Sequence, residues 1–200
     1  GVDRHRAAVA LADPRVGVFD GFHFSLHPRE PRSMYRGFLN SSSVARARRC
    51  RAQYDPAFAA AEERYGVSAS VLAAILHVET ACGQNTGRSP ILAGLAHLAM
   101  AAEPANLRDN VERQTGVAYP LDAEEAQPTV ERGRQLEATF YPEVRATFEV
   151  AQRFHVDPLE IRGSGSGAFG IPQFLPTSYL RYGRDGNGDG EVSLYDHDDA

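Results

Sequence analysis

A segment rich in glycine and proline near the end of this chain constrains its fold most strongly. Residues 163–179 read GSGSGAFGIPQFLPTSY, and Gly183 follows shortly after. Glycine permits positive φ and a close approach of the backbone to a neighbour, while Pro172 and Pro176 fix φ in the turns. The segment therefore predicts a loop with a fixed path, suited to line one wall of a groove for an extended polymer.

The composition is that of a soluble globular protein large enough for one domain. The 200 residues are 42% hydrophobic and 24% charged, with a net charge of -5 and a pI near 5.8. This acidic balance argues against a general nucleic-acid binder, which usually has a basic face. No run of 18 apolar residues occurs, so no transmembrane segment is predicted. The chain opens on Gly1, which indicates a processed form whose export signal or lipid anchor would not be visible.

Two cysteines, Cys50 and Cys82, are the only ones in the sequence. This number fits neither a zinc site nor a disulfide-rich scaffold. We favour two separate buried thiols, and a disulfide formed in an oxidising compartment stays open as the alternative.

The periodicity of the chain predicts a mainly α fold. Residues 1–34 are interrupted by glycine and proline and indicate an irregular N-terminal arm, while 35–200 read as one helical domain. Within that domain, the polar and proline-containing stretch 103–128 predicts a surface insertion with at most one short helix. A further helix is expected to begin at Ser89-Pro90, and the helical pattern from residue 129 is expected to be interrupted at Pro142.

Two consecutive helices have clear start and stop signals. Asp55 suits the N-cap and Pro56 the first position of a helix that Gly66 closes, and Ser68 starts the next one. In that second helix one face combines three apolar residues and a carboxylate, at i, i+3, i+4 and i+7: Leu72, Ile75, Leu76 and Glu79.

Glu79 is therefore expected on a buried helix face. Loss of hydration favours the protonated form of a carboxylate, and the negative end of the helix dipole acts in the same direction. Such a carboxylic acid can donate a proton near neutral pH, which glycosidic cleavage requires. The alternative is a glutamate whose carboxylate reaches solvent or pairs with an arginine.

Two motifs carry a family resemblance. Glu79-Thr80 is followed by Gly83, and the lead-in AEERYGV precedes this helix at 61–67. Downstream, GSGSGAFG and QFLPTSY complete the pattern within 163–179. Together these residues resemble the B-type family of lytic murein transglycosylases, lysozyme-like enzymes that cut bacterial cell-wall glycan.

The resemblance implies an α+β lysozyme-like fold with a peptidoglycan-binding groove, and a role for individual residues. Glu79 is the sole catalytic acid and base. Ser164 and Gln173 position the N-acetylmuramyl sugar and the carboxylate. Phe169 and Tyr179 stack on sugar or line the groove, with core packing as the open alternative for both rings.

The implied reaction is non-hydrolytic cleavage of the MurNAc-β-1,4-GlcNAc bond of peptidoglycan, which leaves 1,6-anhydroMurNAc ends. A hydrolytic muramidase and a calcium-stabilised, non-catalytic wall-binding module stay open as alternatives. Peptidoglycan strands are the expected partner of a monomeric protein, in the periplasm or cell envelope.

Residues 185–196 have the spacing of an EF-hand calcium loop. The donors at positions 1, 3, 5, 7 and 12 would be Asp185, Asn187, Asp189, Glu191 and Asp196. Gly190 permits the sharp turn, Glu191 would offer its backbone carbonyl, and Asp196 is one methylene shorter than the usual Glu. A structural calcium ion is expected, because the B-type family has such a loop beside its active site. A metal-free Asp/Gly turn is the alternative.

Overall fold

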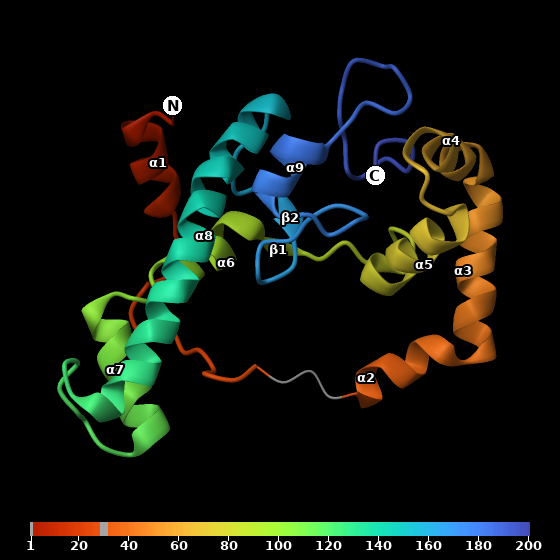
Figure 1. Cartoon of the computed structure of the whole chain (residues 1–200). Helices are drawn as coiled ribbons and strands as arrows, with labels where there is room; N and C mark the ends of the chain where they lie inside the picture. The colour runs from red at the N-terminus through yellow and green to blue at the C-terminus, as the bar shows by residue number, and fades with distance from the viewer. Residues whose placement is uncertain (1, 29–31) are drawn as a thin grey trace. The chain divides into compact units, whose positions relative to one another are not determined.

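The computed structural model describes residues 2–28 and 32–200, and it is mostly helical with one small sheet (Figure 1). The chain divides into two compact units. Unit 1 comprises Gly1–Pro28 and Arg88–Gly167, and unit 2 comprises Arg29–Gly87 and Ala168–Ala200. The mainly α prediction is confirmed. The arm over 1–34 and the domain over 35–200 do not coincide with these units and stay a prediction about domain organisation.

Unit 1 is organised around one long helix. Its elements are α1 (Arg4–Leu11), β1 (Ser89–Pro90), α6 (Ile91–Ala99), α7 (Pro104–Thr115), η2 (Glu124–Ala126), α8 (Gln127–Arg153) and β2 (Arg162–Gly163). The two strands pair antiparallel, Ser89 with Gly163 and Pro90 with Arg162. The helix expected from Ser89-Pro90 therefore begins two residues later, because these two residues pair with β2.

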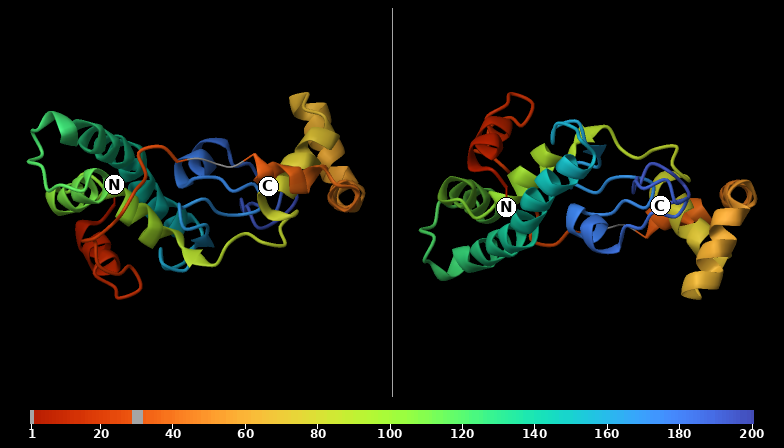
Figure 2. Two further views of the ribbon diagram at one scale, coloured as in Figure 1. Left: turned by 90° about the horizontal axis from the view of Figure 1, so that it is seen from below. Right: turned by 90° about the horizontal axis from the view of Figure 1, so that it is seen from above.

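Helix α8 runs without interruption through Pro142, so the expected break there is wrong. Proline removes one hydrogen bond and usually kinks or ends a helix. Here α8 packs along α6 and α7 (Figure 2), and it has buried side chains on both sides of the proline, including Leu136 and Val144. We attribute the continuity to this packing. Within the described ranges 2–28 and 32–200, none of the helices is long and apolar enough to cross a membrane.

Helix α7 is longer and more buried than the polar stretch 103–128 suggested. It has 12 residues, and Pro104 occupies its first turn rather than breaking it. Its polar residues Asn106 and Asn110 are fully buried. Their side-chain oxygens accept the backbone N–H groups of Phe22 at 3.1 Å and of Phe24 at 3.0 Å. The asparagines thus hold the N-terminal arm within unit 1.

The backbone of the glycine-rich segment in unit 1 lies directly against α6. A Cβ added at Gly94 would overlap the carbonyl oxygen of Gly165, and one added at Gly167 would overlap the side chain of Leu95. Gly167 also has a φ of +90°, a backbone conformation that residues with a side chain rarely adopt. The approach therefore requires glycine at Gly94 on the helix and at Gly167 on the loop.

We expect Gly94→Ala to lower the free energy of unfolding by about 1–3 kcal/mol, because overpacking against a backbone atom cannot be relieved by a rotamer change. Gly165→Ala is the matched control, since a Cβ there meets nothing within 4 Å. Chemical denaturation of both variants is the measurement. Equal stability of the two would show that the close approach is not needed.

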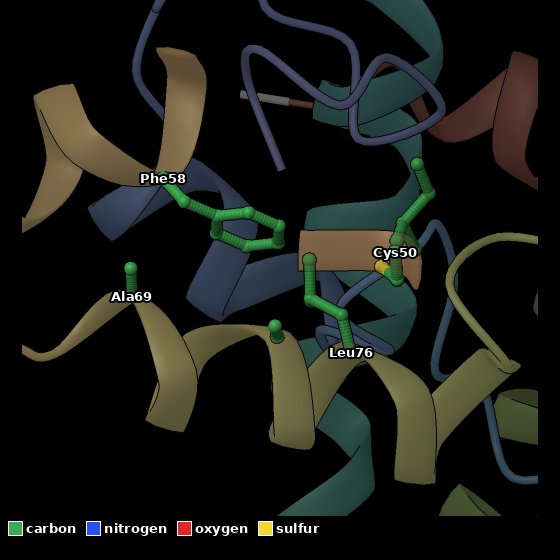
Figure 3. Close-up of a cluster of buried hydrophobic side chains, with 6 residues drawn as sticks. Cys50, Phe58, Ala69 and Leu76 are labelled. Atoms are coloured by element: carbon green, nitrogen blue, oxygen red, sulfur yellow. The ribbon is translucent and has the colours of Figure 1, made fainter. Parts of the chain in front are cut away.

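In the described part of unit 2, three helices position the candidate site, with two short helical turns before them and α9 after them. The elements are α2 (Ser33–Arg36), η1 (Gly37–Leu39), α3 (Ser41–Gln53), α4 (Asp55–Tyr65), α5 (Ala69–Thr80) and α9 (Pro176–Tyr182). Phe58 of α4 points toward Ala69 and Leu76 of α5 in the apolar core of this unit (Figure 3). This core holds α5, which carries Glu79, against its neighbours.

The predicted helix ends are largely confirmed. Gly66 ends α4 in the left-handed conformation with a φ of 72°. Ser68 caps α5 and accepts the N–H of Ser70. Asp55 is not a cap, however, because α4 begins one residue earlier than expected, with Tyr54 at the N-cap position.

Cys50 of α3 and Cys82, just after α5, form a disulfide. The favoured interpretation of two separate thiols is therefore wrong, because α3 packs along α5 and brings the two residues to a Cα–Cα distance of 6.3 Å. In the chain-entropy model, a crosslink over 32 positions stabilises a fold by about 3–4 kcal/mol. The bond fastens the turn after α5 to the rest of unit 2.

Candidate functional site

Glu79 lies at the end of α5 and is exposed, so the expectation of a buried carboxylate is wrong. Ile75, which the apolar stripe placed in the core, is also 49% exposed. The buried face of the helix is instead Ala69, Ala73, Leu76, His77 and Thr80. Glu79 thus projects from the outer face of an otherwise well-packed helix, where a ligand can reach it.

The face of α5 differs from the apolar pattern because two polar residues find buried partners. His77 is 6% exposed, and its Nε2 lies 2.8 Å from the hydroxyl of Ser43 in α3. Thr80 is 1% exposed. A buried polar group is tolerated when it is hydrogen-bonded, so the bond of His77 to Ser43 and that of Thr80 to the Ile171 carbonyl select the face that turns inward.

Thr80 anchors the end of the helix beside Glu79. Its hydroxyl donates to the carbonyl oxygen of Ile171 at 2.8 Å and accepts the N–H of Gly83 at 2.9 Å. Ala81 and Cys82 then turn the chain with positive φ values of 52° and 60°. The end of α5 is thereby fixed against the Phe169–Phe174 segment, and sequence reasoning assigned Thr80 no such role.

Gln173 lies in the same segment and has a constrained position. Its φ is 54°, and its side-chain Nε2 donates to Gly170 at 2.9 Å and to Thr86 at 3.2 Å, both at carbonyl oxygens. In the described part of the chain no donor lies on its Oε1. The side chain thus holds the loop with its amide nitrogen and leaves its oxygen as an acceptor.

Phe169 and Tyr179 lie in the core of unit 2, with exposed fractions of 0% and 2%. Their ring centroids are 5.7 Å apart, and the Tyr179 hydroxyl donates to the carbonyl of Val192 at 2.9 Å. Rings without exposed surface cannot stack on a sugar. Core packing, the alternative that the sequence left open, therefore fits both residues.

Ser164 belongs to unit 1 and is half-buried in the loop after β2. Its carbonyl accepts the N–H of Gly167 at 3.1 Å, which closes a tight turn at the point where the loop lies on α6. The structure thus gives Ser164 a fixed backbone within unit 1.

The loop 185–196 is held by its own side chains. The Asp185 carboxylate accepts the N–H groups of Gly188 and Gly190, Asn187 accepts that of Asp189, and Asp189 accepts that of Glu191. Each carboxylate oxygen has two acceptor positions, so these bonds leave capacity for a cation. The donor set, oxygen only, suits a hard cation such as Ca²⁺.

The acid that folds back onto this loop is Asp199, which sequence reasoning missed. Its carboxylate accepts the N–H of Gly186 at 2.7 Å and that of Ser193 at 2.8 Å, whereas Asp196 accepts the N–H of its near neighbour Asp198. Among the residues that the structure describes, no three acidic, histidine or cysteine side chains gather as a metal site. The residue types fit calcium, and closing the site requires side-chain movement.

The mostly helical fold with one small sheet matches that of solved, lysozyme-like lytic transglycosylases. A family model described as a transglycosylase SLT domain matches residues 21–200, and the chain belongs to this family. The resemblance found in the two sequence motifs is thereby confirmed.

Individual relatives agree with this assignment. The chain is 32% identical, over 148 residues, to membrane-bound lytic murein transglycosylase B of Escherichia coli, covering 74% of this chain and 32% of that protein. The E. coli lytic transglycosylase SLT35, solved in complex with calcium, matches with a TM-score of 0.63 at 28% identity, covering 84% of this chain and 44% of that one. Soluble lytic transglycosylase SltB1 of Pseudomonas aeruginosa matches with a TM-score of 0.65 at 26% identity, covering 86% of this chain and 50% of that one. The chain thus spans about a third of the curated relative's length.

His77 gives the fold a testable pH dependence. Burial, and then the positive charge of Arg46, lower the pKa of His77 below its ordinary value of 6.5. Between the two values the unfolded chain binds a proton that the folded protein excludes. The stability that depends on a neutral His77 is therefore fully present above about pH 6.5, and it is lost as pH falls toward the lower pKa of His77 in the folded protein.

We expect the melting temperature to fall as pH is lowered from 7.5 to about 5, and His77→Gln to flatten that dependence. Gln retains hydrogen-bonding groups for Ser43 but does not titrate. His23→Gln, at an exposed position, is the control and should keep the wild-type profile. A His77→Gln profile parallel to wild type would mean that His77 is not the titrating group.

Proposed function

We propose that this chain carries the catalytic carboxylate of a peptidoglycan lytic transglycosylase. It would cleave the MurNAc-β-1,4-GlcNAc bond without water and leave 1,6-anhydroMurNAc ends. Membership in the transglycosylase family supports this. The observation that carries the proposal is an exposed Glu79 on a helix end that Thr80 fixes to Ile171.

Glu79 performs both proton transfers of the proposed reaction. Its protonated carboxyl donates to the glycosidic oxygen as the bond to the anomeric carbon breaks, so the GlcNAc leaves as a neutral alcohol. The resulting carboxylate takes the proton from the muramyl 6-hydroxyl, whose oxygen bonds to the anomeric carbon and closes the anhydro ring. One carboxylate suffices because the substrate supplies its own nucleophile, unlike the two-carboxylate scheme.

The bound polymer supplies the desolvation that the free protein does not. Glu79 is exposed, so a glycan strand covering it would remove water and favour the neutral acid before bond cleavage. The Oε1 of Gln173, which lacks a described donor, can accept a hydrogen bond from a sugar hydroxyl or from the protonated carboxyl. Ser164 is proposed as a second polar contact to the muramyl sugar.

Two other functions are weighed against this one. A hydrolytic muramidase would use the same acid but add water, and its products would be heavier than anhydro products by one water. A non-catalytic wall-binding module would bind purified peptidoglycan without changing it. Mass spectrometry of digested peptidoglycan separates all three.

We expect Glu79→Gln to retain the fold and peptidoglycan binding but to lose at least about 100-fold in turnover, because an amide cannot donate and retrieve a proton. Glu63→Gln, the same change at an exposed position of α4, is the matched control and should retain most activity. Turbidity loss gives the rate, and the product masses give the reaction. More than about a tenth of wild-type turnover in Glu79→Gln would exclude this residue as the acid.

The loop 185–196 is proposed to bind a structural calcium ion. The oxygen ligands would come from the side chains of Asp185, Asn187 and Asp189 and from the carbonyl of Glu191. The last ligand would be either Asp196, expected from the spacing, or Asp199. The contacts of Asp199 with Gly186 and Ser193 favour it as the closing acid. Calcium would hold this loop against the core and take no part in proton transfer. The calcium complex of SLT35 supports the choice of ion.

Millimolar calcium should raise the melting temperature, and chelation should lower it. A ligand that binds only the folded state stabilises it by about 2.7 kcal/mol at a hundredfold excess over Kd, and we expect a Kd of ~10⁻⁴–10⁻³ M. Asp185→Ala should abolish the shift, and exposed Asp198→Ala should retain it. Comparing Asp196→Ala with Asp199→Ala identifies the closing acid. If the melting temperature of the wild type does not change at millimolar calcium, the loop is a metal-free turn.

The disulfide supports a location in the periplasm or cell envelope. Disulfides form and persist in oxidising compartments and are rare in the cytosol. Cys50 and Cys82 are paired, and peptidoglycan, the proposed partner, lies in the same compartment.

A further inference from the structure

The turn that directly follows Glu79 has a second fastening besides the disulfide. His197 donates from Nε2 to the carbonyl oxygen of Cys82 at 3.2 Å. A carbonyl can only accept, so the proton of this bond is on the histidine. The two residues are 115 positions apart in the chain, and neither the catalytic motif nor the Asp-rich loop uses this contact.

The ring of His197 is held in place by stacking. It lies on the ring of Tyr54 with a centroid distance of 3.6 Å and an interplanar angle of 9°. Its Cε1 atom faces Gly83, where an added Cβ would come within 3.3 Å. A histidine covered on one ring face by Tyr54 and contacted at its Cε1 edge has restricted rotamer freedom, so its Nε2 is held toward Cys82.

The disulfide and the His197 hydrogen bond both connect Cys82 to the end of α3. Cys50 lies in the last turn of α3, and the N–H of Tyr54 donates to the carbonyl of Cys50 at 3.1 Å. The disulfide therefore ties the Cys82 side chain to the end of α3, while Tyr54 and His197 tie its carbonyl to the same place. The side chain and the carbonyl group of Cys82 are thus fixed by two separate contacts.

This turn needs such support. Ala81 and Cys82 both have positive φ, a conformation that is unfavourable for residues with a Cβ and that persists only where surrounding contacts impose it. The N–H of Cys82 is bonded to the carbonyl of Leu76 at 2.9 Å, and His197 supplies the bond on the carbonyl side. Without it the last turn of α5, which contains Glu79, has fewer constraints against fraying.

We propose that His197 is a positioning residue for Glu79. It holds the Cys82 carbonyl, and thereby the left-handed turn and the last turn of α5, in the one arrangement that places the carboxylate for proton transfer. The inference rests on the proposed function, in which Glu79 is the acid and base. Misplacement of a catalytic group by a fraction of an ångström to 1 Å lowers turnover without weakening substrate binding at distant contacts.

The test compares His197→Ala, His197→Gln and, as a control at an exposed histidine, His23→Ala. Each variant is assayed on purified peptidoglycan at a temperature where circular dichroism shows it fully folded. Hydrogen exchange of the peptide covering 76–83 reports the turn directly and does not depend on activity. Glu79→Gln shows how much cleavage depends on the carboxylate.

We expect His197→Ala to lower kcat about tenfold with KM changed less than about twofold, and to speed exchange in 76–83. His197→Gln, whose amide N–H can reach the same carbonyl, should recover most of kcat, and His23→Ala should match wild type. A residue that only stabilises the fold would lower the melting temperature and leave kcat of the folded protein unchanged.

Two results would overturn the inference: wild-type kcat in folded His197→Ala, or unchanged exchange over 76–83. Failure of the proposed function looks different. In that case the wild type itself does not cleave, or Glu79→Gln cleaves as well as wild type, whatever the exchange data show.

Discussion

The hydroxyl of Thr80 is the contact on which the candidate site depends. It is buried, it donates to Ile171, and it accepts from Gly83, so it joins the end of α5 to two other parts of unit 2. Neighbouring residues of an α-helix point about 100° apart. Once Thr80 is fixed inward, Glu79 is therefore turned away from that direction, and it is exposed. The orientation of the carboxylate follows from its neighbour and not from burial of the glutamate itself.

This dependence explains what the sequence could and could not predict. Local signals placed Gly66 and Ser68 correctly at helix ends, because capping involves residues a few positions apart. The buried face of α5 was assigned partly wrongly, because the apolar spacing includes Ile75 and leaves out the polar residues His77 and Thr80. Their partners, Ser43 and Ile171, lie 34 and 91 positions away, and no local pattern contains that information.

The same limit applies to contacts made by the ends of loops. The spacing rule for calcium loops selects Asp196, whereas the carboxylate that contacts the loop is Asp199. Gly186 makes this fold-back feasible, because a Cβ there would overlap the carbonyl of Asp198. The glycine at the second position of the loop was thus the available signal. Likewise, the disulfide could be named as an alternative but not selected until α3 and α5 were seen to pack together.

An exposed glutamate beside exposed apolar groups is consistent with the proposed chemistry. Burial within the fold was expected to remove water from the carboxylate, but a bound strand can do the same. Ile75 and Val78 are 49% and 41% exposed on the face that carries Glu79. Isolated apolar side chains at a surface are ordinary, but here they adjoin a carboxylate whose proposed work needs a dry environment. A polymer laid over this face would exclude water from all three side chains together, so desolvation of the acid would accompany binding. The free protein then avoids the cost of a buried, unpaired carboxylate, and water is excluded from the site only when a strand is present to receive the proton.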